Sequence, residues 1–209
     1  MTLRIVTLEV ADPPSAWAGA GFTVDADAMC RVEGVRVQLV GGERGSGIIA
    51  WALDGLPPDA GDDVDGIPTT GSHAAASVPA VHPNGVTTID HLVVMSPDLD
   101  RTVAAFRDLG AHPRRERDAD VGGRPIRQVF FRFAETIIEV VGSPGTAGPG
   151  PSTLWGITYV VADIDAAARY FGERTSPVKA AVQPGRRITT LRHHELGLSV
   201  RTALISARP

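Results

Sequence analysis

The hydrophobic pattern changes period within one short stretch of the chain, residues 87–106, TTIDHLVVMSPDLDRTVAAF. The branched apolar run at 89–95, interrupted by His91, predicts a β-strand. Ser96 and Pro97 then predict the start of a helix, because serine caps helices and proline suits the first helical position. Apolar residues recur at helical spacing after this point: Leu99, Val103, Phe106 and Leu109.

The strand and helix belong to a longer pattern that occurs twice. Three more strands are predicted after the helix, at 113–117, 125–133 and 136–142, which gives the order βαβββ. The order returns in LWGITYVVADIDAAARYFGE, residues 154–173, and in strand candidates at 187–193 and 198–205. Alignment of the two copies sets His91 opposite Gly156 at a repeat of about 65 residues. Because so small a unit cannot bury its own sheet face, we expect two units to close one sheet around a shared cleft.

The N-terminal part carries weaker copies of the same pattern. Strands are predicted at 3–10, 31–41 and 47–54. VRVQLVG at 36–42 resembles TIIEVVG, which sets Gln38 opposite Glu139, and GIIAWALD at 47–54 resembles GITYVVAD. Either the N-terminal segment is a degenerate copy of the repeat, or short β-rich segments that end in glycine resemble one another by chance. We favour the repeat, because the two matches occur in the correct order.

These patterns predict an α+β fold made of three parts. Residues 1–56 are expected to form a degenerate, β-rich half-unit packed on the main domain. Residues 57–81 are rich in Gly, Pro, Asp and Ser without a period, which predicts a linker or surface loop. Residues 82–209 are expected to form the main domain, with its βαβββ units at 87–143 and 153–206.

Composition narrows the classes of function. The net charge of −4 and the absence of a basic stripe argue against a nucleic-acid partner. Cys30 is the only cysteine, so the chain has no intramolecular disulfide and no thiolate metal cage. The sequence contains no apolar run of about 18 residues, the length needed to span a membrane. We therefore expect a cytoplasmic protein.

Three segments resemble the vicinal oxygen chelate superfamily, the glyoxalase/bleomycin-resistance/dioxygenase group: IDHLVVMSPDLDRTVAAF, IIEVVG and WGITYVVADIDAAARYF. Together with HPNGVTTIDHLVV, they look like a bacterial glyoxalase-like subgroup, and the resemblance covers roughly residues 82–206. It implies paired βαβββ units around a U-shaped cleft, a small-molecule ligand and a homodimer. It also implies a divalent metal, zinc, nickel, manganese or iron, held by the first and last strands of each unit.

On this resemblance His91 and Glu139 occupy the metal-ligand positions of the first unit, and Glu139 could instead act as a catalytic base. Strand alternation would put Ile89, His91 and Val93 on one sheet face. The second unit departs from the pattern, with Gly156 in its first strand and Ser199 or Arg201 in its last. Metal ligation and a metal-free hydrogen-bonded pair both remain open for His91 and Glu139.

Other polar and aromatic residues have two readings each. His193, His194 and Glu195 are expected to form a polar turn, with at most one histidine pointing inward. Aromatic residues could line a substrate pocket or, as is more common for residues of strands, fill the core: Phe130, Phe131, Phe133, Trp155 and Tyr159. Arginines before strands could meet an anionic substrate or be solvated, the latter being favoured: Arg124, Arg127, Arg186 and Arg187.

Two functions follow from these expectations. The first is a metal-dependent lyase, isomerase or dioxygenase acting on a small oxygenated molecule. The second is a metal-free protein that binds and sequesters a small molecule, as the bleomycin-resistance members do.

Overall fold

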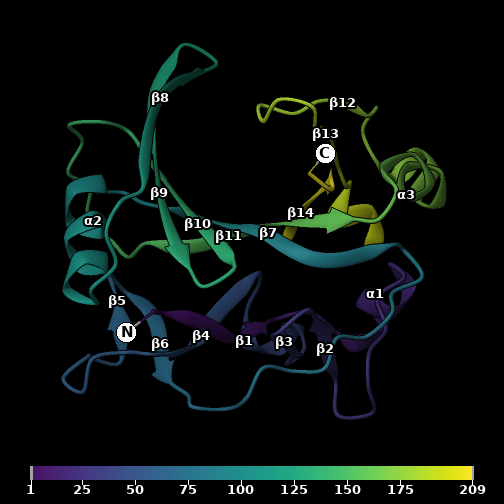
Figure 1. Ribbon diagram of the computed structural model, residues 1–209, viewed down its shortest axis with the longest axis horizontal. Coiled ribbons are helices and arrows are strands. Elements are labelled where there is room, and N and C mark those ends of the chain that lie inside the picture. Colours follow the sequence, from purple (N-terminus) through teal and green to yellow (C-terminus); the bar gives the residue numbers. More distant parts are fainter. Residues whose placement is uncertain (1, 209) are drawn as a thin grey trace.

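The computed structural model describes residues 2–208 and consists of two stacked layers of strands (Figure 1). The C-terminal strands form the upper layer, with α2 and α3 at its two outer ends, and the N-terminal strands form the lower layer. One register pair, Ile48 with Leu154, joins the two layers into a single 14-stranded sheet. No helix within residues 2–208 has the length and apolar character needed to cross a bilayer.

The upper layer confirms the two predicted βαβββ units and the α+β class. The first unit comprises β7 (Val86–Met95), α2 (Leu99–Asp108), β8 (Arg115–Val121), β9 (Arg124–Phe133) and β10 (Thr136–Gly142). The second comprises β11 (Thr153–Val161), α3 (Ile164–Phe171), β12 (Lys179–Ala180), β13 (Arg187–Thr190) and β14 (Arg201–Ser206), with 3₁₀ turns η2 (Gly172–Arg174) and η3 (His193–Leu196). In each unit the first and last strands pair in parallel, and β7 pairs with β11 antiparallel.

The lower layer repeats part of this arrangement. It contains β1 (Arg4–Val10), α1 (Pro14–Gly19), β2 (Met29–Val32), β3 (Val35–Leu39), η1 (Gly42–Arg44), β4 (Ile48–Asp54), β5 (Asp63–Val64) and β6 (Ile67–Gly71). β1 pairs with β3 in parallel and with β4 antiparallel, as β7 pairs with β10 and β11. Gln38 thereby faces Glu9 across the strands, as Glu139 faces Val93.

Residues 57–81, expected to be a linker or surface loop, contain the short strands β5 and β6, and β6 pairs with β4. Asp65 and Gly66, with φ of 52° and 81°, make the tight turn between these strands. The Asp65 carboxylate accepts hydrogen bonds from the hydroxyls of Thr102 and Ser152, which fixes the turn against the first unit. Strands this short leave too few residues for a periodic signal.

The start of α2 also differs from the prediction. Asp98, not Ser96, caps the helix by accepting the backbone N–H of Arg101 at 3.1 Å. The Ser96 hydroxyl instead lies 2.6 Å from the hydroxyl of Thr102. Both serine and aspartate are good caps, so the sequence alone could not decide between the two positions.

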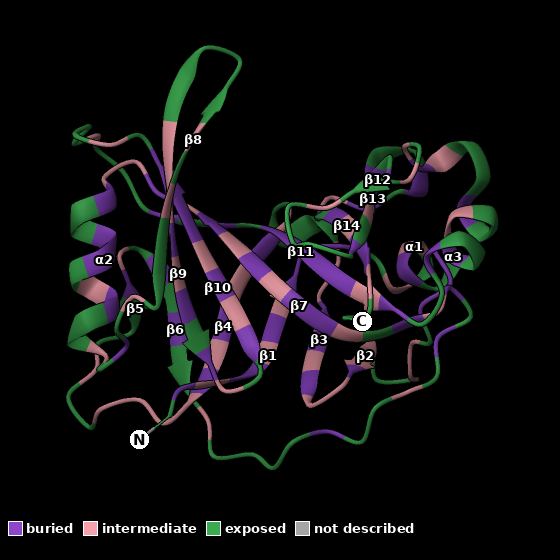
Figure 2. Ribbon diagram, turned by 45° about the horizontal axis from the view of Figure 1, so that its top comes forward, coloured by how far each residue is buried: buried purple, intermediate pink, exposed green. Residues whose placement is uncertain are grey.

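Aromatic side chains fill the core between the layers and beneath α2. Figure 2 shows in purple which parts of the strands and of α2 are buried. Trp51 of the lower layer lies 6.0 Å from the Phe133 ring, and Phe22 lies 5.4 Å from Tyr159. Phe131 packs against Phe106 of α2 at 4.9 Å. Phe131, Phe133 and Tyr159 are 0–1% exposed, so these three residues fill the core, and the alternative that they line a substrate pocket is wrong.

Candidate functional site

The upper sheet has one face turned away from this core. Strand register sets His91 opposite Thr158, Glu139 opposite Val93, and Thr158 opposite Ala203. Directly opposed residues share a face, so these five residues define what we call the open face. The residues between them along the strands, such as Leu92, Ile138 and Ile157, are 0–2% exposed and point into the core.

A β-bulge at Asp90 decides which residues of β7 reach the open face. Ile89 pairs with Tyr159 and His91 pairs with Thr158, which leaves Asp90 as an extra residue without a cross-strand partner. The predicted alternation is therefore broken, since Ile89 joins the core at 3% exposure instead of sharing a face with His91. The bulge also lets the Asp90 carboxylate reach Nδ1 of His91 at 2.8 Å.

Arg186 holds the other oxygen of Asp90. Its Nη1 donates to Asp90 Oδ1 at 2.6 Å and its Nε donates to the Ser206 carbonyl at 2.8 Å. The two side chains are only 3% and 5% exposed, so the expectation of a solvated Arg186 is wrong. Burial alone would raise the pKa of the Asp90 carboxyl, but hydrogen bonds from His91 and Arg186 outweigh burial and hold this pKa below its usual value.

The structure brings His91 and Glu139 together, as the resemblance implies. His91 Nε2 lies 3.5 Å from Glu139 Oε2, and the side chains are 14% and 12% exposed. The Gln128 amide donates to the other oxygen of Glu139. With Nδ1 bonded to Asp90, the His91 ring directs Nε2 toward Glu139. The ring nitrogen and the carboxylate together form a polar site for a ligand group.

The second unit has no metal-ligating side chain at the positions that match His91 and Glu139. Its first-strand position is Gly156, which pairs with Arg201. Glu139 pairs with Val93, two residues beyond His91. The residue two beyond Gly156 is Thr158, which pairs with Ala203, so Ala203 is the counterpart of Glu139. The predicted last-strand candidates, Ser199 and Arg201, are therefore at the wrong register.

A divalent metal does not fit this donor set. Protein sites for such ions supply three or four ligands, whereas within residues 2–208 only His91 and Glu139 lie together on the open face. A Cβ added at Gly156 would lie 2.7 Å from the Arg201 carbonyl oxygen, so β14 leaves no room for a ligand side chain there. Within residues 2–208, no group of three His, Cys, Asp or Glu side chains is placed to hold an ion.

A pocket of about 160 Å³ lies on the part of the open face that the second unit forms. Trp155 lies at its edge because a second bulge, between the pairs Leu154–Val94 and Gly156–Val93, leaves it unpaired. Trp155 is 44% exposed, and the Arg201 guanidinium carbon lies 4.8 Å from the centre of its ring.

His193 lines the same pocket at 9% exposure, whereas His194 is exposed. Only one histidine of the predicted polar turn therefore points inward. Burial lowers the pKa of His193, and the neighbouring His194 and Arg201 lower it further, so its imidazole is neutral at neutral pH.

Two further predicted positions change in the structure. Arg127 lies outside the pocket and forms an exposed ion pair with Asp118 of β8 at 2.7 Å. Phe130 pairs with Glu139 and is half-buried on the open face, so it takes the place predicted for Phe131 and Phe133. Alternation along β9 could have separated these phenylalanines, because Phe131 and Phe133 share one face and Phe130 lies on the other.

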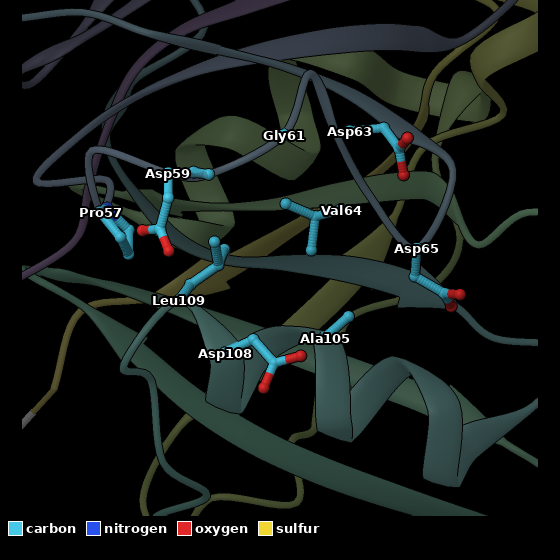
Figure 3. A pocket seen from close by; sticks show the side chains of 10 residues that line it. Pro57, Asp59, Gly61, Asp63, Val64, Asp65, Ala105, Asp108 and Leu109 are labelled. Carbon is cyan, nitrogen blue, oxygen red and sulfur yellow. The ribbon is translucent and has the colours of Figure 1, made fainter.

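A second pocket, of about 230 Å³, lies between α2 and the loop that leads into β5. Figure 3 shows four of its carboxylates spread around the rim rather than converging on one point: Asp59, Asp63, Asp65 and Asp108. Asp63 accepts the Gly66 N–H at 2.7 Å, and Asp65 is bound by Thr102 and Ser152. Asp63 and Asp65 therefore stabilise the turn between β5 and β6.

Comparisons with solved structures agree with this fold. The chain resembles a triple mutant of 4-hydroxymandelate synthase from Streptomyces coelicolor with a TM-score of 0.66 and 16% identity, over 100% of this chain and 94% of that one. It resembles a xylose isomerase-like TIM barrel/4-hydroxyphenylpyruvate dioxygenase fusion protein with a TM-score of 0.61 and 12% identity, over 100% of this chain and 49% of that one. At these identities the likeness concerns the fold alone. No protein of curated function matches the sequence.

The family assignment rests on the sequence as well as on the fold. A family model described as the glyoxalase/bleomycin resistance protein/dioxygenase superfamily matches residues 88–194, which span β7 through the start of η3. This segment includes His91, Glu139 and Gly156, and the two βαβββ units have the pairing that the resemblance implies. The chain therefore belongs to the glyoxalase/bleomycin resistance protein/dioxygenase superfamily.

Proposed function

We propose that this protein binds a small organic molecule on the open face and that binding requires no metal ion. The observation that carries the proposal is the donor set: His91 and Glu139 in the first unit are matched by Gly156 and Ala203 in the second. This favours the sequestering function over the metal-dependent lyase, isomerase or dioxygenase.

The polar end of the ligand would meet His91 and Glu139. A ligand hydroxyl could donate a hydrogen bond to the Glu139 carboxylate and could also hydrogen-bond to His91 Nε2. The buried Asp90–Arg186 pair holds the His91 ring in position, so the site is preorganised before the ligand arrives. Val93 and Phe130, both half-buried beside Glu139, provide apolar contact for the body of the ligand.

Metal analysis tests the first half of the proposal. The protein is purified without chelators and without a histidine tag, and its zinc, nickel, manganese and iron are measured by mass spectrometry. We expect far less than one ion per chain and no rise in melting temperature when these ions are added. Stoichiometric metal that disappears in His91→Ala would refute the proposal and restore the metal-dependent enzyme.

Ligand binding tests the second half. Uncharged hydroxyl-bearing aromatic compounds are screened by thermal shift, since a ligand at 100 times its Kd stabilises the folded state by about 2.7 kcal/mol. We expect Glu139→Gln and His91→Ala to remove the shift. Glu135→Gln, which removes an exposed carboxylate from the same hairpin, is the matched control and should keep it. A panel that never raises the melting temperature would count against binding.

The resemblance also implies a homodimer, and we retain this as part of the proposal. Light scattering coupled to size-exclusion chromatography would test it, with a mass near one chain as the contrary result.

A further inference from the structure

We infer that the pocket beside Trp155 recognises a carboxylate group of the ligand, with Arg201 as the residue that binds it. The inference rests on the proposed function of the open face and adds the chemical class of the ligand.

Arg201 has a guanidinium that the protein itself does not neutralise. Within residues 2–208, no aspartate or glutamate oxygen lies within 4.0 Å of its nitrogens. Arg187, by contrast, donates from both terminal nitrogens to Asp165 at 2.9 and 2.7 Å. Stacking on Trp155 at 4.8 Å restrains the plane of the Arg201 group and leaves its N–H edges available. A planar guanidinium with free edges binds carboxylates in a bidentate manner.

The lining of the pocket suits an anion. Its residues include no aspartate or glutamate, so a carboxylate would meet no repelling charge there. Thr190 and the neutral His193 add hydrogen-bonding groups at its wall, while Gly156 and Ala203 keep its floor open. The other pocket, between the β5 loop and α2, is lined by four aspartates and would repel the same group.

The register of the sheet sets the length of the ligand. Glu139, Val93, Gly156 and Arg201 are opposed in sequence on four neighbouring strands and form one row across the open face. Three strand spacings separate the Cα atoms of Glu139 and Arg201 by about 14 Å in a flat sheet. The geometry therefore calls for a ligand with a carboxylate at one end, an apolar body over Val93, and a hydroxyl at the other end.

Paired probes that differ only in charge test the inference. We would titrate 3-(4-hydroxyphenyl)propanoate, its primary amide and phenyl phosphate, following tryptophan emission and calorimetric heat. Trp17 and Trp51 are 1% exposed and Trp155 is 44% exposed, so quenching by added acrylamide reports mainly on Trp155. The variants are Arg201→Gln, Arg201→Lys and, as the matched loss of one exposed arginine from the same unit, Arg169→Gln.

We expect the propanoate to bind at least tenfold more tightly than its amide and to protect Trp155 from quenching. Arg201→Gln should remove this preference, Arg201→Lys should keep part of it, and Arg169→Gln should keep all of it. Equal binding of acid and amide, or an unchanged preference in Arg201→Gln, would overturn the inference. Tighter binding of phenyl phosphate than of the propanoate would also overturn it, in favour of a phosphate site.

The two proposals fail in different ways. If the amide binds and Glu139→Gln weakens it while Arg201 variants have no effect, the proposed function stands and the carboxylate subsite falls. If the propanoate binds through Arg201 but Glu139→Gln and His91→Ala change nothing, the carboxylate subsite stands and the assigned polar end falls. Absence of binding by every probe would refute both.

Discussion

Replacing Arg186 by methionine tests whether the buried ion pair beneath His91 is needed for stability. Methionine keeps much of the length of the side chain but removes both the donor to Asp90 Oδ1 and the donor to the Ser206 carbonyl. Asp90, at 5% side-chain exposure, would then remain buried with His91 as its remaining partner. Removing one partner of a buried pair costs about 3–5 kcal/mol, a large part of the 5–15 kcal/mol that is typical of a folded domain.

Urea unfolding at pH 7, followed by circular dichroism and fluorescence, would measure this loss. At about 2–4 °C per kcal/mol for a chain of this size, the melting temperature should fall by roughly 10 °C. Arg187→Met is the control, because Arg187 and Asp165 are 49% and 50% exposed and their loss should change stability little. Removing both charges with Asp90→Asn and Arg186→Met should recover part of the loss, since no unpaired ion then stays buried.

The pH dependence gives a second criterion. The pKa of Asp90 is lowered in the folded protein, so its stabilising contribution is present above the unfolded-state pKa and is lost as pH falls through the folded-state pKa. In Arg186→Met burial should raise the Asp90 pKa, so that the variant recovers stability as the carboxyl becomes protonated. The gap between the two proteins should therefore narrow from pH 7 toward pH 4. A loss below about 1 kcal/mol at pH 7, or a gap that does not narrow, would refute the reasoning.

Two other predictions concern the open face and the core behind it. Gly156→Ala should lower the free energy of unfolding in urea by about 1–3 kcal/mol, because its Cβ would lie 2.7 Å from the Arg201 carbonyl oxygen. Calorimetry should also find weaker ligand binding. Unchanged stability would contradict the close approach of β14. Phe131→Ala should cost about 3–5 kcal/mol as a loss from the core, whereas Phe130→Ala should cost less and weaken ligand binding. The opposite order of stability losses would show that the faces of β9 are assigned wrongly.

The repeat unit could be predicted from the sequence because its signals are local. The strand and helix of residues 87–106 differ in period, and Asp98-Leu99-Asp100 at the start of the first helix recurs as Asp163-Ile164-Asp165 at the start of the second. The convergence of His91 and Glu139 required only the resemblance and the alternation within their strands. These inferences need no knowledge of contacts between distant segments.

The rest of the site depends on contacts that strand periodicity cannot reveal. Asp90 and Trp155 reach their positions through bulges, which reverse the expected alternation at one residue. Arg186 has an ordinary turn sequence around it, and only the fold brings its guanidinium to Asp90, 96 positions away in the chain. Ala203 became the counterpart of Glu139 only when the parallel register of β11 and β14 was known.

Because the two strand layers pack on each other, the segment that matches the family is shorter than the segment needed to cover the core. The family match begins at residue 88, but Trp51 and Phe22 from the preceding segment cover the aromatic rings of Phe133 and Tyr159. A gene trimmed to residues 82–209 would encode both repeats and yet leave these rings exposed to water. Any grafting or recombination of this cleft onto another scaffold must therefore carry the first 71 residues with it, or supply a substitute apolar cover.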